Sequence, residues 1–244
     1  MRNIKVVVGY DGTDYFGFQY QPEARTIQAE LERVLRLITK EKVTVYGSGR
    51  TDTGVHAEGQ VISFRTEGSI PIDKLCIAMN SLLPPSIAVT EAGEVDADFH
   101  ARYSARSRLY VYDILNRAVP SALQSRYSWH VRRPLDVQAM SESAKPLLGV
   151  HDFSSFACAD RDEGSPIRDM TKLDVERQGE HVFVTMRANA FLRSMARIIV
   201  GTLVEVGLGQ RPGADVETIL EAHDRRLAGK TAPPQGLCLK EVEY

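Results

Sequence analysis

"YGSGRTDTGVHAEGQ" occupies residues 46–60 and combines four glycines with a single arginine and a single aspartate, Arg50 and Asp52. The run that leads into it, "KVTVYGSG" at residues 42–49, and the run that leaves it, "GQVISFRT" at residues 59–66, contain β-branched and aromatic residues, which indicates strands. The pattern therefore predicts a polar, glycine-rich loop between two strands. A loop that is carried on rigid strands is a common place for a reactive side chain.

Strand and helix signals alternate on both sides of this loop. Residues 4–10 ("IKVVVGY") form an apolar, β-branched run typical of a buried strand. Apolar residues then recur at helical spacing from Ile27, and Thr26 is suited to be the N-cap. A second helix is predicted from residue 72 until Pro84 stops it, followed by a strand over residues 86–95.

The second half repeats the strand–helix–strand order. "RLYVYDIL" at residues 108–115 alternates as a strand does, with Tyr110, Tyr112 and Ile114 on one face. The elements expected after it are a helix near 136–148, a hairpin formed by residues 171–177 and 181–188, a long helix over 189–207 with Asn189 as N-cap and Gly207 as its end, a shorter helix over 214–224, and a closing strand over 236–244. The sequence thus predicts an α+β protein in two halves, residues 1–105 and 106–244, that share one sheet.

Composition excludes several classes of protein. The 244 residues are 43% hydrophobic and 25% charged, with a formal net charge of −2, so a nucleic-acid partner would have to meet a local basic surface. Three cysteines without a CxxC pair argue against a disulfide framework and a thiolate zinc site. The first residues lack the features of a signal peptide, and the longest apolar run is interrupted by Glu205. We expect a cytoplasmic protein.

The glycine loop has three possible functions. A phosphate-binding loop would need a lysine or a following helix, and here Arg50, Thr51 and Asp52 stand instead, with a carboxylate that would repel phosphate. A simple hairpin turn is consistent with glycine and aspartate, and the length of the loop and its polar cluster weaken this alternative. The third possibility is that the loop presents Asp52 as a reagent.

A basic, aromatic segment follows between residues 101 and 133. Seven arginines stand there against one acid: Arg102, Arg106, Arg108, Arg117, Arg126, Arg132 and Arg133. The aromatic residues between them are Tyr103, Tyr110, Tyr112, Tyr127 and Trp129. This composition favours RNA or DNA, because arginine neutralises phosphates and aromatic rings stack on bases. The alternative is a solvated, arginine-rich face of an ordinary strand.

Further charged residues lie on the long helix and beside the loop. Arg197 is surrounded by apolar neighbours in sequence, and a buried guanidinium requires a carboxylate, for which Asp52 is a candidate. Structural roles are expected for His56 and His100, although either side chain is also suited to orient the loop or contact phosphate. His151, Asp152 and Ser154 are adjacent in sequence, which does not produce the geometry of a hydrolase triad.

With these residues identified, the chain resembles the bacterial tRNA pseudouridine synthase A family along nearly its whole length. The motifs that carry the resemblance are "GSGRTDTGVHAEGQVISF", "FHARYSARSRLYVYDI", "GVHDFSSF", "NAFLRSMARIIVGTLVEVG" and "TAPPQGLCLKEVEY". Thr53 departs from many members, which carry alanine there. The resemblance implies two ferredoxin-like halves joined by a continuous mixed, mainly antiparallel sheet, with helices on one side and a central catalytic cleft.

The resemblance also implies an activity and its residues. The expected reaction isomerises uridine to pseudouridine at positions 38, 39 and 40 of the tRNA anticodon arm, by a homodimer, without metal or organic cofactor. By the same resemblance Asp52 is the catalytic aspartate, Arg50 assists nucleotide extrusion, Tyr110 lies against the uracil, Arg197 pairs with the aspartate, and Leu237 lines the base pocket.

Three chemical routes for Asp52 stay open from the sequence: attack at C1′, attack at C6, and removal of the 2′ proton. Two other functions are also open. One is an RNA-binding protein without catalytic activity, and the other is a glycosidase or nucleosidase, although no second catalytic carboxylate is evident.

Overall fold

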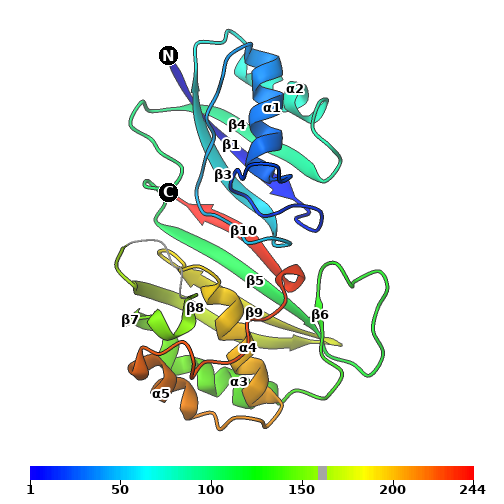
Figure 1. Cartoon of the computed structure of the whole chain (residues 1–244), viewed down its shortest axis with the longest axis vertical. Helices are drawn as coiled ribbons and strands as arrows, with labels where there is room; N and C mark the ends of the chain where they lie inside the picture. Colours follow the sequence, from blue (N-terminus) through cyan, green and yellow to red (C-terminus); the bar gives the residue numbers. More distant parts are fainter. Residues whose placement is uncertain (159–163) are drawn as a thin grey trace. The chain divides into compact units, whose positions relative to one another are not determined.

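The computed structural model describes residues 1–158 and 164–244. Two compact units emerge: Met1–Arg106 together with Leu239–Tyr244 form the first, and Ser107–Cys238 form the second. Ten strands and five α-helices lie in the described residues (Figure 1). β1 with β3, β1 with β4, β2 with β3, β5 with β9, β7 with β8 and β8 with β9 pair antiparallel, and β5 with β6 pairs parallel. The predicted α+β class is confirmed.

The first unit is built around its N-terminal strand. It contains β1 (Arg2–Tyr10), β2 (Tyr46–Gly47), β3 (His56–Thr66), β4 (Ile87–Val95), α1 (Ile27–Thr39), α2 (Ile72–Asn80) and most of β10 (Leu237–Glu243). β1 runs antiparallel to both β3 and β4, and the short β2 pairs with β3. Ile4, Val6 and Val8 alternate along β1 and are fully buried. The buried strand predicted over residues 4–10 is confirmed, and these side chains mark the core face of the sheet.

Helix α1 confirms its predicted N-cap and apolar stripe. The Thr26 hydroxyl accepts a hydrogen bond from the backbone N–H of Ala29, and Ile27, Leu31 and Val34 are fully buried. The cap satisfies one of the N–H groups that a helix start leaves without a partner. α1 therefore begins where its sequence signal places it.

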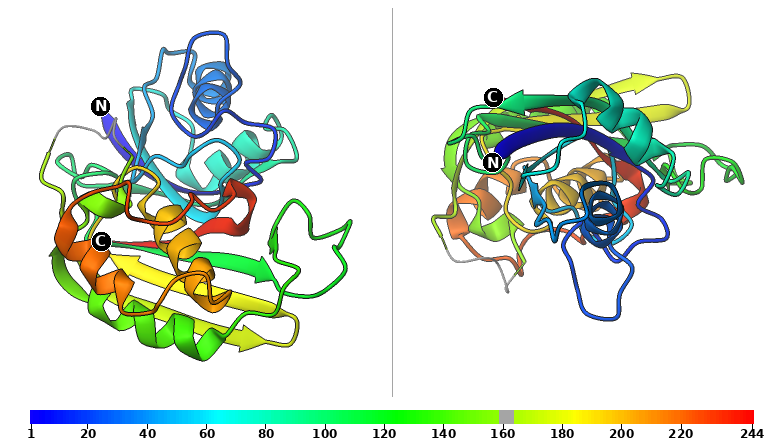
Figure 2. Two further views of the ribbon diagram at one scale, coloured as in Figure 1. Left: turned by 60° about the horizontal axis from the view of Figure 1, so that its bottom comes forward. Right: turned by 90° about the horizontal axis from the view of Figure 1, so that it is seen from above.

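The second unit has the strand order β5-β9-β8-β7, with β6 paired to the outer side of β5. Its strands are β5 (Ser107–Leu115), β6 (Trp129–His130), β7 (Gly149–Asp152), β8 (Ile167–Gln178) and β9 (His181–Ala188). Its helices are α3 (Val137–Ala144), α4 (Met195–Gly207) and α5 (Asp215–Ala222), with short 3-10 turns η1 (Lys145–Leu147), η2 (Ser154–Phe156) and η3 (Pro234–Gly236). α3 packs against α4 and β8, and Figure 2 shows the helices of this unit over its strands.

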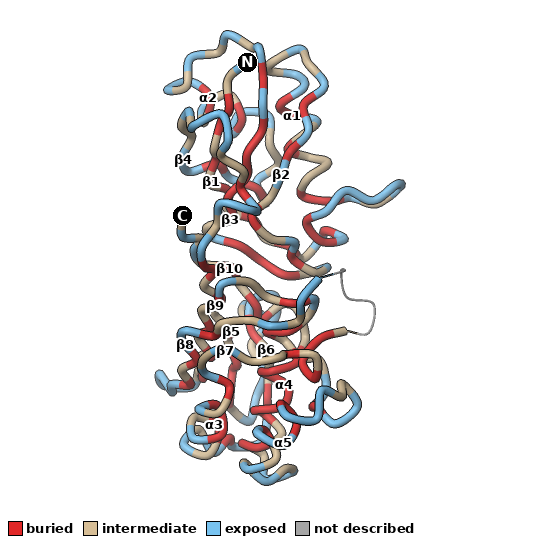
Figure 3. The backbone as a smooth tube through the Cα atoms, turned by 90° about the vertical axis from the view of Figure 1, so that its left-hand side faces the viewer, coloured by how far each residue is buried: buried red, intermediate tan, exposed pale blue. Residues whose placement is uncertain are grey.

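Helix α4 is the most buried element of the second unit. Eleven of its thirteen residues are buried, and the two exceptions are the charged residues Arg197 and Glu205 (Figure 3). Glu205 is bonded by Arg211 at 3.0 Å and by the backbone N–H of Lys230 at 3.1 Å. The helix is thus a core helix with polar contacts at two points. None of the described helices combines the length and apolar character needed to cross a membrane.

The strand predicted over residues 42–49 is much shorter in the structure. The structure has only Tyr46 and Gly47 in β2, opposite Ser63 and Ile62. The N–H of Val45 donates to Glu32 Oε1 at 3.0 Å, and its carbonyl accepts from Gln28 Nε2 at 3.2 Å. Side chains of α1 therefore bond the backbone here in place of a neighbouring strand.

The predicted N-cap of the long helix is wrong. Helix α4 begins at Met195, after Ser194 in the left-handed conformation with φ 59°. Asn189 Oδ1 accepts instead from the N–H groups of Asp169 and Ala190, at 3.0 and 2.8 Å. The asparagine is used to join β8 to the end of β9, and the helix starts six residues later. Its end at Gly207 is as predicted.

A close backbone approach in the second unit generates a stability prediction. A Cβ at Gly201 would lie 1.7 Å from the carbonyl oxygen of Lys230, whereas a Cβ at Gly93 in β4 would meet nothing within 4 Å. We expect Gly201→Ala to lower the free energy of unfolding by about 2 kcal/mol, since overpacking forces the backbone to move. Urea denaturation followed by circular dichroism measures it.

Gly93→Ala is the matched control and should change stability by less than about 1 kcal/mol. Equal stability of the two variants would contradict the close approach between α4 and residue 230.

Candidate functional site

The loop that carries Asp52, residues 48–55, is anchored at its start by a buried amide. Gln60 is fully buried on β3, and its Oε1 accepts from Ser48 Oγ at 2.6 Å. Its Nε2 donates to the carbonyl oxygen of Gly49 at 2.9 Å and to the Tyr10 hydroxyl at 3.3 Å. Because an unpaired amide in the core is costly, these bonds fix the beginning of the loop.

The middle of the loop is anchored by Thr51. Its hydroxyl lies 2.8 Å from the Tyr10 hydroxyl, and its carbonyl oxygen accepts from the N–H of Phe18 at 3.1 Å. Thr51 is buried, Asp52 is half-buried and Thr53 is exposed. Asp52 therefore stands at the boundary between a fixed interior and solvent. Arg50, on the other side of Thr51, is exposed.

Two glycines allow residues 12–17 to lie directly against the loop. A Cβ at Gly12 would lie 2.0 Å from the carbonyl oxygen of Val55, and a Cβ at Gly17 would lie 2.8 Å from that of Thr51. Gly17 also has φ +86°, a conformation that side chains disfavour. The N–H of Gly54 completes the contact by donating to the Tyr15 carbonyl. The loop is therefore supported by backbone as well as by side chains.

His56 joins the end of the loop to the end of β1. It is buried, its Nδ1 accepts from the N–H of Gly12 at 3.0 Å, and Asp11 Oδ1 lies 3.2 Å from the same nitrogen. These contacts agree with the structural role that the sequence favours for His56.

Three further predicted site residues lie in the second unit. Tyr110 is buried on β5 opposite Met186, and the edge of its ring contacts Phe191 at 4.9 Å between centroids and 78° between planes. A tyrosine held by a T-shaped contact has a fixed ring plane. Phe191 was not expected from the sequence as part of this group.

Arg197 lies in the first turn of α4 and is bonded to the chain that precedes β10. Its Nε donates to the Ala232 carbonyl oxygen at 2.8 Å, and the N–H of Ala232 donates to its carbonyl at 3.1 Å. The two bonds fix the direction of the guanidinium. They also tie α4 to residues 232–237.

Tyr112 joins this segment to β5. Its hydroxyl donates to the Pro233 carbonyl oxygen at 2.7 Å, and a Cβ at Gly236 would lie 2.6 Å from its ring. Burial raises the pKa of Tyr112 strongly, and the nearby charge of Arg197 opposes that rise, so the phenol stays a hydrogen-bond donor. Leu237, which is buried, begins β10 immediately after Gly236. Within the second unit, Tyr112 thus links the strand of Tyr110 to the segments of Arg197 and Leu237.

The arginine-rich segment has two kinds of member. Arg108 is buried and donates to the Asn189 carbonyl at 2.6 Å, and Arg117 pairs with Glu180 at 2.8 Å. The other arginines predicted there are exposed: Arg102, Arg106, Arg126, Arg132 and Arg133. Arg102 and Arg106 belong to the first unit and the others to the second.

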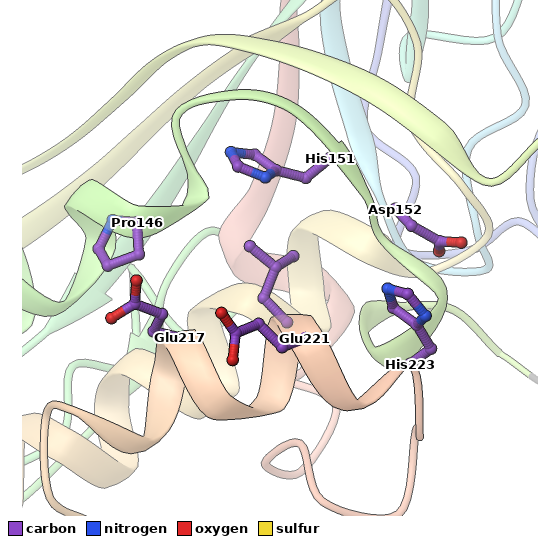
Figure 4. Close-up of a pocket in the computed structure, with 7 residues that line it drawn as sticks. Pro146, His151, Asp152, Glu217, Glu221 and His223 are labelled. Carbon is purple, nitrogen blue, oxygen red and sulfur yellow. The ribbon is translucent and has the colours of Figure 1, made fainter.

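A cavity of about 170 Å³ lies in the second unit, away from these residues in sequence (Figure 4). Its lining includes Pro146, His151, Asp152, Glu217, Leu220, Glu221 and His223. His151 Nε2 is bonded to the Leu148 carbonyl at 2.7 Å, and Asp152 accepts from the Ser154 N–H at 2.8 Å. Both are local contacts between residues two or three positions apart. Among the residues that the structure describes, no cluster of histidine, cysteine and acidic side chains is arranged to hold a metal ion.

Comparison with known proteins identifies the family of this chain. The family model described as tRNA pseudouridine synthase matches residues 6–104 and 143–244. The tRNA pseudouridine synthase A of Brevibacillus brevis is 50% identical over 244 residues and covers 100% of both chains. That of Halalkalibacterium halodurans is 49% identical and covers 97% of this chain and 90% of its own.

Among solved structures, a chain from the crystal structure of a Cbf5-Nop10-Gar1 complex is similar with a TM-score of 0.34 and 15% identity. The match covers 96% of this chain and 57% of that one. A likeness of this size adds nothing to the argument.

The Gln60 contacts generate a prediction about the loop. We expect Gln60→Ala to lower the free energy of unfolding by about 2–3 kcal/mol, because it removes one buried group and leaves Ser48 Oγ and the Gly49 carbonyl without this partner. Amides of residues 48–55 should exchange hydrogen faster, which mass spectrometry measures.

Gln138→Ala, on the exposed face of α3, serves as the control and should leave both quantities unchanged. Unaltered exchange of residues 48–55 in Gln60→Ala would show that the amide does not hold the loop.

Proposed function

Because the chain belongs to the tRNA pseudouridine synthase family, a family of isomerases, we propose that it converts uridine to pseudouridine in the anticodon stem-loop of tRNA, at positions 38, 39 and 40. The observation that carries the proposal is the half-buried carboxylate of Asp52 on a loop held by Gln60, Thr51 and residues 12–17. Such a loop presents one carboxylate at a fixed position, which suits an isomerisation without cosubstrate.

The reaction conserves every atom. The N1–C1′ bond breaks, the uracil turns, C5 joins C1′, the proton leaves C5, and N1 gains one. No oxidant, reductant or second substrate is needed. The base in a helix is inaccessible to this chemistry, so the nucleotide has to be flipped out of the stack at a cost of a few kcal/mol.

Asp52 is proposed as the catalytic group. In the transition state the sugar carbon gains positive charge and the base gains negative charge, and a carboxylate stabilises the former or bonds to it covalently. Attack at C1′, attack at C6 and removal of the 2′ proton are all available to an aspartate. We propose Arg197 as the cation that keeps this carboxylate ionised in a water-poor site, supported by the Ala232 contact that orients its guanidinium.

Tyr110 and Leu237 are proposed to contact the uracil. A tyrosine face allows the detached base to rotate, and its hydroxyl is able to assist proton removal from C5. The Phe191 contact supports this role, since it fixes the ring plane. Leu237 supplies an apolar wall for the base.

Arg50 is proposed to stabilise the flipped state. Its exposure on the loop beside Asp52 supports this role, because a guanidinium is able to bond the phosphates and fill the gap that the nucleotide leaves.

We also propose that the protein acts in the cytoplasm as a homodimer on tRNA. The family resemblance supports this proposal, and sedimentation equilibrium with and without tRNA would measure the oligomeric state. A monomer at all concentrations would contradict the dimer alone, not the reaction.

The first test concerns Asp52. With tRNA that contains C5-tritiated uridine, Asp52→Asn should release tritium at least about 10³-fold more slowly than wild type, because the catalytic charge is lost, while tRNA affinity stays within a few-fold. Asp73 is an exposed residue of α2, and Asp73→Asn is the control, which should release tritium at the wild-type rate.

Product analysis separates the alternatives. Free uracil among the products would indicate a nucleosidase, and tight binding without any tritium release by wild type would indicate an RNA-binding protein. Full turnover by Asp52→Asn would remove the proposed role of Asp52.

The second test concerns Arg50. Arg50→Ala should lower turnover about 10- to 100-fold on a uridine paired in the stem, since part of the flipping cost is no longer compensated. Replacing the opposing nucleotide by a mismatch lowers that cost and should restore part of the rate. A rate loss that is equal for paired and mismatched uridine would contradict a role in flipping.

A further inference from the structure

Three aromatic rings form a row on the surface of the first unit. The Tyr46 and His100 rings lie 4.9 Å apart between centroids, and the His100 and Tyr103 rings lie 4.5 Å apart. Tyr46 is 48% exposed and Tyr103 is 77% exposed. Burial of these tyrosines therefore contributes little to folding, and much of each side chain is accessible to a ligand. The ring planes are tilted by 47° between Tyr46 and His100 and by 37° between His100 and Tyr103. We call Tyr46, His100 and Tyr103 the aromatic row.

The row stands on a fixed support. The N–H of His100 donates to Ser104 Oγ at 3.0 Å, and the N–H of Ser104 donates back to the His100 carbonyl at 2.9 Å. The buried Ala101 between them is held by Ser63 Oγ at 3.0 Å and by the Tyr244 hydroxyl at 2.8 Å. Ser63 also lies opposite Tyr46 in the β2–β3 pair, so one residue of β3 contacts both Tyr46 and the backbone next to His100. A row fixed in this way loses little entropy when a ligand binds.

Two guanidinium groups accompany the row. Arg102 lies over the Tyr103 ring at 5.7 Å from its centroid, and the exposed Arg65 is bonded to the Ala97 carbonyl at 2.7 Å. Burial lowers the pKa of His100, and the charges of Arg102 and Arg65 lower it further. His100 is therefore neutral at pH 7, which agrees with its Nδ1 accepting from the Arg102 N–H at 3.1 Å. The surface thus combines uncharged ring faces with positive charge.

We propose that the aromatic row is a stacking platform for unpaired nucleotides of the RNA substrate, with Arg102 and Arg65 at the adjacent phosphates. Aromatic rings stack on any base, and arginine neutralises phosphate. Paired bases have no accessible face, so the platform takes nucleotides in a loop or at an end. The inference rests on the proposed function for the identity of the RNA, and it adds a binding site formed by residues other than those proposed for the chemistry.

Affinity measurements with single variants test the platform. Tyr103→Leu should raise the Kd for tRNA about tenfold, as expected for one lost stacked base, while kcat at saturating tRNA stays within about twofold. Tyr103→Phe keeps the ring and should keep wild-type affinity. Ile77→Ala removes exposed apolar surface from α2 of the same unit and should also keep it. Thermal denaturation of each variant shows whether it is folded.

The salt dependence tests the charges. Arg102→Gln should reduce the slope of log K against log salt by about 0.7, the value for one phosphate of a single strand. An altered fold alone does not produce this change. An unchanged slope would overturn the assignment of Arg102 to a phosphate.

Crosslinking locates the RNA contact. With p-benzoylphenylalanine in place of Tyr103, crosslinks should fall on unpaired nucleotides of tRNA. Crosslinks confined to paired stems, or a Tyr103→Leu variant with wild-type Kd, would overturn the platform.

The outcomes separate this inference from the proposed reaction. If the wild-type protein forms pseudouridine and the Tyr103→Leu variant binds tRNA with unchanged affinity, the platform is ruled out and the proposed reaction stands. A protein that forms no pseudouridine but loses tRNA affinity in Tyr103→Leu would keep the platform and remove the reaction.

Discussion

The bonds of one buried amide determine how Asp52 is presented. Gln60 has no solvent exposure, and its donors and acceptor are engaged by Ser48, Gly49 and Tyr10. A buried polar group is tolerated only while its hydrogen bonds are made. If the start of the loop moved, the Gln60 amide would lose these bonds while still buried, which is costly in free energy. The loop is therefore as rigid as the strand that carries Gln60. That rigidity holds the backbone of Asp52 at a fixed position relative to β3.

In the second unit, close backbone contacts take the place of a buried side-chain amide. Gly201 and Gly236 allow residues 230–236 to approach α4 and the Tyr112 ring more closely than any side chain would permit. That approach brings the Ala232 carbonyl to Arg197 and the Pro233 carbonyl to the Tyr112 hydroxyl. The arginine is thus oriented by main chain, which stays in place whatever rotamers its neighbours adopt.

Local signals in the sequence predicted most elements, because those elements depend on local physics. Thr26 caps α1, and the apolar run at residues 4–10 forms the buried strand β1, as the sequence predicts. The two errors have a common cause. Val45 is a β-branched residue typical of a strand, but side chains of α1 bond its backbone. Asn189 is a residue type typical of an N-cap, but its side chain bonds Asp169 of β8. In both places a partner distant in sequence took the hydrogen bonds.

The sequence by itself determined the α+β class and the position of the glycine loop between two strands, since periodicity, capping and motif are local properties. Only the tertiary structure decided that Gln60, Thr51 and residues 12–17 support Asp52, that Tyr112 links β5 to the segments of Arg197 and Leu237, and that Tyr46, His100 and Tyr103 form a row. The reason is that these contacts join residues remote along the chain. Such contacts depend on which backbone groups still lack a hydrogen-bond partner once the strands and helices have formed. No local sequence pattern specifies those groups.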